Sequence, residues 1–168
     1  GPAELAFRRP KLNLPPDTWL PENLPDAYVL IHTTSAWRNK SWPAVSWAAV
    51  LDDLHAQGIG PFVATGGNDE WESRYVEEIR CATKAPLMNL SGKTALPGYL
   101  ATVSKASMVL CIDGSAAHLA AAFRRPSITL FGPTHPLHWH YPADDSAMID
   151  ARAFSKEKRP SVAAIPVN

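Results

Sequence analysis

Residues 108–123 read MVLCIDGSAAHLAAAF, and this stretch decides the fold of the chain. Its first five residues form a continuous apolar run, which is typical of a buried strand. The turn Asp113-Gly114-Ser115 follows, and the Ala-rich segment from Ser115 to Phe123 predicts a short helix. A buried strand that runs through small residues into a helix is the repeating unit of a parallel α/β sheet.

The same unit recurs on both sides of this stretch. Apolar runs predict strands, and apolar residues spaced by three or four positions predict the helices between them. Pro43 can open a helix that Gly58 ends, and Asp69 with Glu72 resembles a capping box. We expect strands over 28–31, 62–64, 87–90, 108–112, 128–131 and 147–149, with further helices over 95–105 and 115–123. The alternation predicts an α/β fold with a doubly wound parallel sheet.

Composition limits the function classes. The chain has 168 residues, 46% of them hydrophobic and 19% charged, which suits a folded domain. Sixteen basic residues balance sixteen acidic ones, so a nucleic-acid partner is not expected. No apolar run reaches the roughly 20 residues that cross a bilayer, so no transmembrane segment is expected. Cys81 and Cys111 are predicted to be reduced structural thiols of a cytosolic protein.

Proline marks the N-terminal boundary of the domain. Six of the 16 prolines fall within the first 25 residues, and such a segment favours an extended linker. We therefore predict an interdomain linker over 1–26, with Gly1-Pro2 as a protease-cleavage scar from a tag. The ligand-binding domain is predicted over 27–150, and a C-terminal tail over 151–168.

Ligands of such sheets bind beyond the carboxyl ends of the strands, so the loops there are the candidates. The loop at 32–42 carries Thr33, Thr34, Ser35 and Lys40 before a helix start, which suits a phosphate group or an ordinary polar surface. In the loop at 66–70, Glu70 could accept hydrogen bonds from ribose or serve only to cap a helix.

Two further loops carry polar groups. After Asp113, the backbone of Gly114 and Ser115 can approach a ligand closely, and His118 in the first helical turn could donate to a sugar or phosphate oxygen. The alternative is a helix capped by Ser115 with a buried histidine. The histidine-rich loop at 135–140 suits a solvent-exposed loop or a lid over a ligand better than a metal site, because no cysteine or carboxylate accompanies it.

In combination these loops resemble glycosyltransferase family 9, the lipopolysaccharide heptosyltransferases, over roughly residues 28–142. The resemblance is closest to the heptosyltransferase I type and concerns its C-terminal, donor-binding domain. It rests on Ile31-His32-Thr33-Thr34 with Lys40 and Trp42-Pro43, Gly66 with Glu70, Asp113 with His118-Leu119-Ala120-Ala121-Ala122, and Phe131-Gly132-Pro133-Thr134.

The resemblance implies a Rossmann-like domain that forms one half of a GT-B glycosyltransferase and binds ADP-heptose. It places Thr33, Thr34, Ser35 and Lys40 at the diphosphate, and Glu70 and Thr94 at the ribose and adenine. It places Asp113, Gly114, Ser115 and His118 at the sugar and its phosphate, with Thr134 and His135 as candidates for a lid. No metal or other cofactor is expected.

The implied reaction is transfer of heptose, with inversion, to the Kdo-lipid A core of lipopolysaccharide. The family's acceptor domain and general base precede this half, so we expect no catalytic residue here and no turnover by this chain alone. The implied location is the cytoplasm, with peripheral association at the inner face of the inner membrane. Asp113-Gly114-Ser115 and His135 depart from the family pattern. They leave open another nucleotide-sugar or a protein acceptor, and the missing acceptor domain leaves open a non-catalytic nucleotide-binding module.

Overall fold

A computed structural model describes residues 9–15 and 18–167. Their centre is a six-stranded sheet in the order β3-β2-β1-β4-β5-β6, and every neighbouring pair is parallel. The strands are β1 Val29–His32, β2 Phe62–Thr65, β3 Leu87–Asn89, β4 Met108–Ile112, β5 Ser127–Phe131 and β6 Ser146–Asp150. This is the predicted parallel sheet. The direction in which successive strands are added reverses between β1 and β4. This is the switch point at which such sheets bind ligands.

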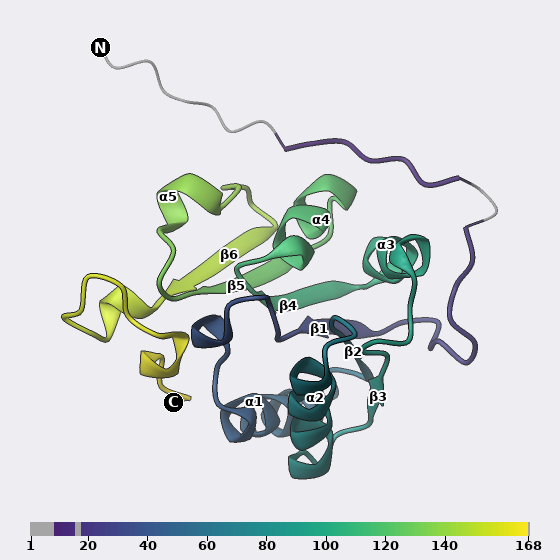
Figure 1. Cartoon of the computed structure of the whole chain (residues 1–168). Coiled ribbons are helices and arrows are strands. Elements are labelled where there is room, and N and C mark those ends of the chain that lie inside the picture. Colours follow the sequence, from purple (N-terminus) through teal and green to yellow (C-terminus); the bar gives the residue numbers. More distant parts are fainter. Residues whose placement is uncertain (1–8, 16–17, 168) are drawn as a thin grey trace.

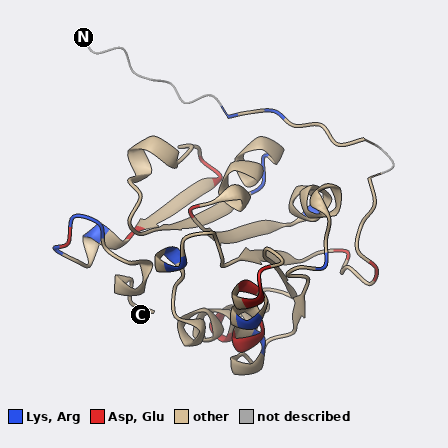
Figure 2. Cartoon of the chain, in the orientation of Figure 1, with Lys and Arg blue, Asp and Glu red and all other residues tan. Residues whose placement is uncertain are grey.

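Helices cover both faces of the sheet (Figure 1). The helices α1 Ala44–Ala56 and α2 Glu70–Ala82 lie on one face, and α3 Leu96–Lys105 and α4 Ser115–Phe123 lie on the other. Successive residues of β1 alternate between two buried clusters: Ile31 packs with the α1 and α2 side, and Leu30 with the α3 and α4 side. Burial on both faces explains why the strands are unbroken apolar runs in the sequence. Charged residues gather on the helix α2, as Figure 2 shows.

The helix ends follow the predicted signals with two differences. Gly58, just beyond α1, has a φ of +80°, which is the left-handed geometry of a helix stop. Asp69 caps α2 by accepting from the Trp71 backbone N–H, but Glu72 reaches back to Gly67 rather than to Asp69. Ser115 does not cap α4, because Gly114 holds the cap position without a side-chain bond. The loop after β5 also contains a short helix, α5 Pro136–Trp139, that the sequence did not predict.

The predicted linker is irregular where it is described. Residues 9–15 and 18–26 contain no helix or strand, but they contact the domain. The Arg9 guanidinium pairs with the Asp145 carboxylate just before β6. Farther along, the ring of Trp19 packs so closely on Gly98 of α3 that a Cβ there would lie 3.0 Å from it. The predicted tag scar at Gly1-Pro2 lies outside the described residues.

The segment after residue 150 packs as part of the domain rather than as a loose tail. It contains two 3-10 helices, η2 Ala151–Ala153 and η3 Val162–Ala164. Val162 and Ile165 are buried in the α1 and α2 cluster, and the indole N–H of Trp42 donates to the Ile165 carbonyl at 2.9 Å. Its apolar residues fall in two short groups, at 151–154 and 162–167, with the polar stretch 155–161 between them, so the sequence shows no long amphipathic pattern there.

Candidate functional site

A cavity of about 550 Å³ opens at the carboxyl edge of the sheet, where the loops after β1, β2 and β3 meet the start of α4. Gly66 marks their closest approach, because a Cβ at this position would lie 3.1 Å from both the Thr34 hydroxyl and the Ser91 Cβ. No Lys or Arg lines the cavity within the described part of the chain, and its one carboxylate is Glu72. The lining residues are His32, Thr34, Ser35, Ala36, Gly66, Gly67, Asn68, Glu72, Gly92, Thr94, Leu96, Tyr99 and Ser115.

The loop after β1 supplies hydroxyl groups to this cavity. Thr33 and Thr34 are fully buried, and neither hydroxyl has a hydrogen-bond partner among the described residues. Of the two, only Thr34 lines the cavity. Ser35, which also lines it, bonds through its hydroxyl to the backbone of Trp37. Because an unpaired buried hydroxyl costs about 1–3 kcal/mol, Thr34 is a candidate to bond a ligand oxygen.

The two acidic residues at the start of α2 have different surroundings. Glu70 points outward, where its exposed carboxylate pairs with Arg74 at 2.5 Å and lies outside the cavity. Glu72 accepts a hydrogen bond from the Gly67 backbone N–H at 2.9 Å and lines the cavity. Of these two carboxylates, only that of Glu72 lies at the wall of the cavity.

Lys40 and Asp113 form a buried ion pair at the same edge of the sheet. The Lys40 Nζ lies 2.8 Å from the Asp113 Oδ2, and the side chains are only 13% and 5% exposed. The Thr134 hydroxyl donates to the same carboxylate oxygen at 2.6 Å. Lys40 enters from the 3-10 helix η1 Arg38–Lys40, so three loops that are distant in sequence meet here. The predicted residues Lys40, Asp113 and Thr134 are therefore brought together, and Asp113 lies two residues before Ser115 of the cavity.

The remaining predicted residues divide between the cavity and its surroundings. Thr94 and Ser115 line the cavity, whereas His118 lies outside it with its ring against Trp139 and Tyr141 at centroid distances of 6.1 and 5.6 Å. His135 caps α5 through its Nδ1, which accepts from the Leu137 backbone at 3.3 Å.

Sequence reasoning missed two aromatic rings on the cavity wall, His32 and Tyr99. They lie face to face at a tilt, with ring centroids 5.4 Å apart. Burial lowers the pKa of His32 to about 4 and raises the pKa of the Tyr99 hydroxyl, so both are neutral at pH 7. The position of His32 at the carboxyl end of a central strand was the signal that could have found it.

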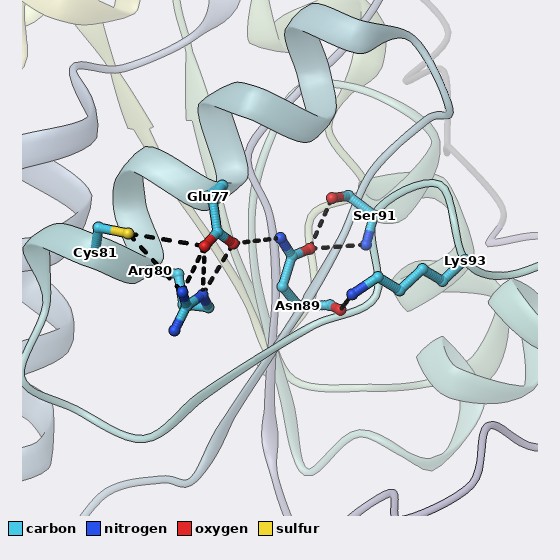
Figure 3. Close-up of polar contacts among 6 residues, drawn as sticks. All are labelled: Glu77, Arg80, Cys81, Asn89, Ser91 and Lys93. Carbon is cyan, nitrogen blue, oxygen red and sulfur yellow. Dashed lines mark hydrogen bonds and ion pairs between the residues drawn. The ribbon is translucent and has the colours of Figure 1, made fainter.

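A polar network between α2 and β3 supports the loop at 91–94, which forms another wall of the cavity (Figure 3). Asn89 lies at its centre: its amide N–H₂ donates to Glu77, and its amide oxygen accepts from the Ser91 backbone N–H and hydroxyl. Hydrogen bonds from Arg80 first, and from Asn89 second, lower the pKa of Glu77 to about 2. Cys81, at the edge of this network, is an exposed free thiol, whereas Cys111 is buried in the sheet.

The sequence profile of glycosyltransferase family 9 (heptosyltransferase) matches residues 4–163 of the chain. The chain belongs to this family. A lipopolysaccharide heptosyltransferase 3 of Escherichia coli is 37% identical over 114 residues, which make up 67% of this chain and 33% of that protein. This family 9 chain therefore spans about a third of the length of that curated relative.

Solved structures of family members share the fold. The E. coli heptosyltransferase WaaC, solved with ADP, superposes with a TM-score of 0.66 at 21% identity, over 84% of this chain and 41% of that one. The iron-containing dodecameric glycosyltransferase TibC of enterotoxigenic E. coli superposes with a TM-score of 0.56 at 19% identity, over 82% and 35% of the two chains. Both likenesses support the GT-B type of Rossmann-like domain that the sequence predicted.

Within residues 9–15 and 18–167, no group of three or more His, Cys, Asp or Glu side chains is placed to hold a metal ion. In the same ranges, no helix is long and apolar enough to cross a bilayer.

Proposed function

We propose that this chain is the donor-binding half of a heptosyltransferase and that its cavity binds the ADP part of ADP-heptose. The observation that carries the proposal is the unpaired Thr34 hydroxyl in a cavity with one carboxylate, in a chain of family 9. The volume of about 550 Å³ lies within the range of small-molecule sites.

Within the cavity, Glu72 takes the ribose role that the sequence gave to Glu70. A carboxylate accepts hydrogen bonds from a ribose diol, and Glu72 is held toward the cavity by the Gly67 N–H. In this proposal the cavity-lining Thr94 contacts the adenine, and Thr34 with Ser35 contacts the diphosphate.

The sugar end of the donor lies at the adjoining Lys40–Asp113 pair. The second carboxylate oxygen of Asp113, which no hydrogen bond from Lys40 or Thr134 uses, is free to accept from sugar hydroxyls. Lys40 and the uncapped N-terminus of α4 offer positive charge to the diphosphate as it departs. This electrostatic help supports transfer without a bound metal, and the acceptor in this proposal is the Kdo-lipid A core of lipopolysaccharide.

The decisive experiment is titration calorimetry of the chain with ADP in the presence of EDTA. We expect binding without added metal, and a loss of about tenfold or more in affinity for Glu72→Gln. Glu70→Gln is the matched control and should leave the affinity unchanged. A folded chain that binds no ADP would overturn the proposal, and binding that requires Mg²⁺ or iron would overturn its metal-free part.

A further inference from the structure

His32 is a buried polar group for which neither the family resemblance nor the proposed ADP contacts supply a role. It ends β1 in register with Thr65, which ends the neighbouring strand β2. The side chains meet: the Nδ1 of His32 lies 2.9 Å from the Thr65 hydroxyl oxygen. The residue is 7% exposed, and that small exposure faces the cavity, because His32 is one of its lining residues. With Nδ1 engaged by Thr65, Nε2 is the ring nitrogen left for a ligand.

The ring is also fixed from the side of α3 and α4. It lies against Tyr99, whose hydroxyl is 2.9 Å from the hydroxyl of Ser115. Ser115 is the first residue of α4, a nine-residue helix whose N-terminus has no side-chain cap. The free N–H groups at such an end attract anions. The imidazole is thus held beside the part of the cavity that best suits a phosphate.

The His32 ring is uncharged at pH 7, and it can still donate a hydrogen bond to a ligand. Burial lowers its pKa to about 4, against an opposing effect of Glu72, so the ring is neutral at pH 7. A neutral imidazole has one N–H and one acceptor nitrogen. If Nδ1 accepts from the Thr65 hydroxyl, Nε2 carries the proton and can donate to a ligand oxygen. Within the described residues no Lys or Arg lines the cavity itself, and Lys40 offers its charge from the adjoining ion pair with Asp113. An uncharged donor such as His32 can therefore bond a phosphate oxygen inside the cavity.

We propose that the Thr65 hydroxyl donates to Nδ1 of His32, and that Nε2, which then carries the proton, donates a hydrogen bond to a phosphate oxygen of the bound nucleoside diphosphate. The inference rests on the proposed function, since it names a contact of the same cavity. His32 is then a binding residue for the diphosphate, and Thr65 is a positioning residue.

The test compares His32→Asn with His32→Gln. The Asn amide can occupy the position of Nδ1 and keep the Thr65 contact, but it cannot reach the position of Nε2. The longer Gln amide can reach it. We expect His32→Asn to weaken ADP binding by about tenfold or more and His32→Gln by about threefold or less. Adenosine, which has no phosphate, should bind all three proteins alike.

Each outcome decides a specific point. Wild-type chain that binds no ADP overturns the proposed function, and the role of His32 falls with it. If the wild type binds ADP and His32→Asn binds it equally tightly, only the role of His32 is overturned. Equal losses in both variants, or an equal loss for adenosine, would also overturn it, because the ring's shape or a contact to the nucleoside would then explain the effect.

A measurement on the unmutated protein covers the case in which a variant fails to fold. Nitrogen-15 NMR of histidine distinguishes the two tautomers. We expect His32 in the ADP complex to be protonated at Nε2, with a shift of that nitrogen on adding ADP but not adenosine. A complex in which His32 is protonated at Nδ1 would overturn the proposal. Thr65→Val should increase the Nδ1-protonated fraction and weaken ADP binding, and Thr65→Ser should restore both.

Discussion

Two polar clusters lie side by side at the carboxyl edge of the sheet, and they satisfy their hydrogen bonds in opposite ways. In the first, Lys40, Asp113 and Thr134 bond to one another. In the second, the Thr34 hydroxyl in the cavity has no partner among the described residues. Removing one partner of the first cluster leaves a buried charge unpaired, whereas the open hydroxyl of the second costs stability until a ligand bonds to it. The predictions below test this difference, beginning with the largest expected effect.

Removing one charge of the first cluster should destabilise the fold strongly. Lys40→Ala leaves the buried Asp113 carboxylate without its counter-ion, and we expect a loss of about 3 kcal/mol in the free energy of unfolding. Urea denaturation at pH 7 measures it. The double variant Lys40→Ala/Asp113→Asn should recover part of the loss because it removes the unpaired charge. A single variant as stable as the wild type would show that the pair is not a folding element.

Removing the unpaired hydroxyl of the second cluster should raise the free energy of unfolding rather than lower it. Thr34→Val replaces an unpaired buried hydroxyl by a methyl group of similar size, so we expect a gain of about 1 kcal/mol in unfolding free energy together with weaker ADP binding. Thermal denaturation and calorimetry measure the two quantities.

Thr33→Val is the matched control for this prediction. Its hydroxyl is also unpaired and buried, but it does not line the cavity. It should therefore gain stability and keep its ADP affinity. If both variants lost affinity equally, the distinction between the two threonines would be wrong.

A smaller effect is expected from Gly67→Ala. The added Cβ would lie 2.7 Å from the Glu72 Oε1, so the carboxylate must move away from its present position. We expect ADP affinity to fall by roughly threefold to tenfold, while stability changes little because this loop is exposed. Gly58→Ala provides a contrast: nothing lies within 4 Å of its Cβ, but its φ of +80° is strained for alanine, so stability alone should fall.

The smallest effect concerns the support of the cavity wall by Glu77. The folded-state pKa of this carboxyl is about 2, below its ordinary value near 4.3, so its contribution to stability is present above the ordinary value. It is lost as the pH falls from about 4 toward 2. We expect the difference in melting temperature between wild type and Glu77→Gln to shrink over that range. A difference that stays constant from pH 6 to pH 2 would contradict the assignment.

The strands and the site differ in how far their residues could be predicted. All six strands were confirmed, because burial on both faces leaves an unbroken apolar run that is visible without any tertiary information. In the loop before α2 the prediction chose Glu70, but the structure turns that side chain to Arg74 and places Glu72 in the cavity. Both residues suit a helix start equally well. Only the path of the loop, with the Gly67 N–H free to bind a carboxylate, distinguishes them.

The C-terminal segment shows the same limit. Val162 and Ile165 belong to a short apolar group that follows the polar stretch 155–161, so the segment resembled a tail. Val162 fits against the domain because Gly132 has no side chain: a Cβ at Gly132 would lie 2.7 Å from the Val162 side chain. No local pattern connects residues that are thirty positions apart.

The amino-acid sequence by itself determined the α/β class, the parallel sheet and the edge at which polar loops gather, because periodicity and burial are properties of neighbouring residues. The tertiary structure alone decided which side chains share a site. It joined Lys40 to Asp113 across 73 positions and His32 to Thr65 across 33, and it separated Glu70 from Glu72. Side-chain direction and the path of each loop are set by contacts with residues distant in sequence, and local spacing does not record those contacts.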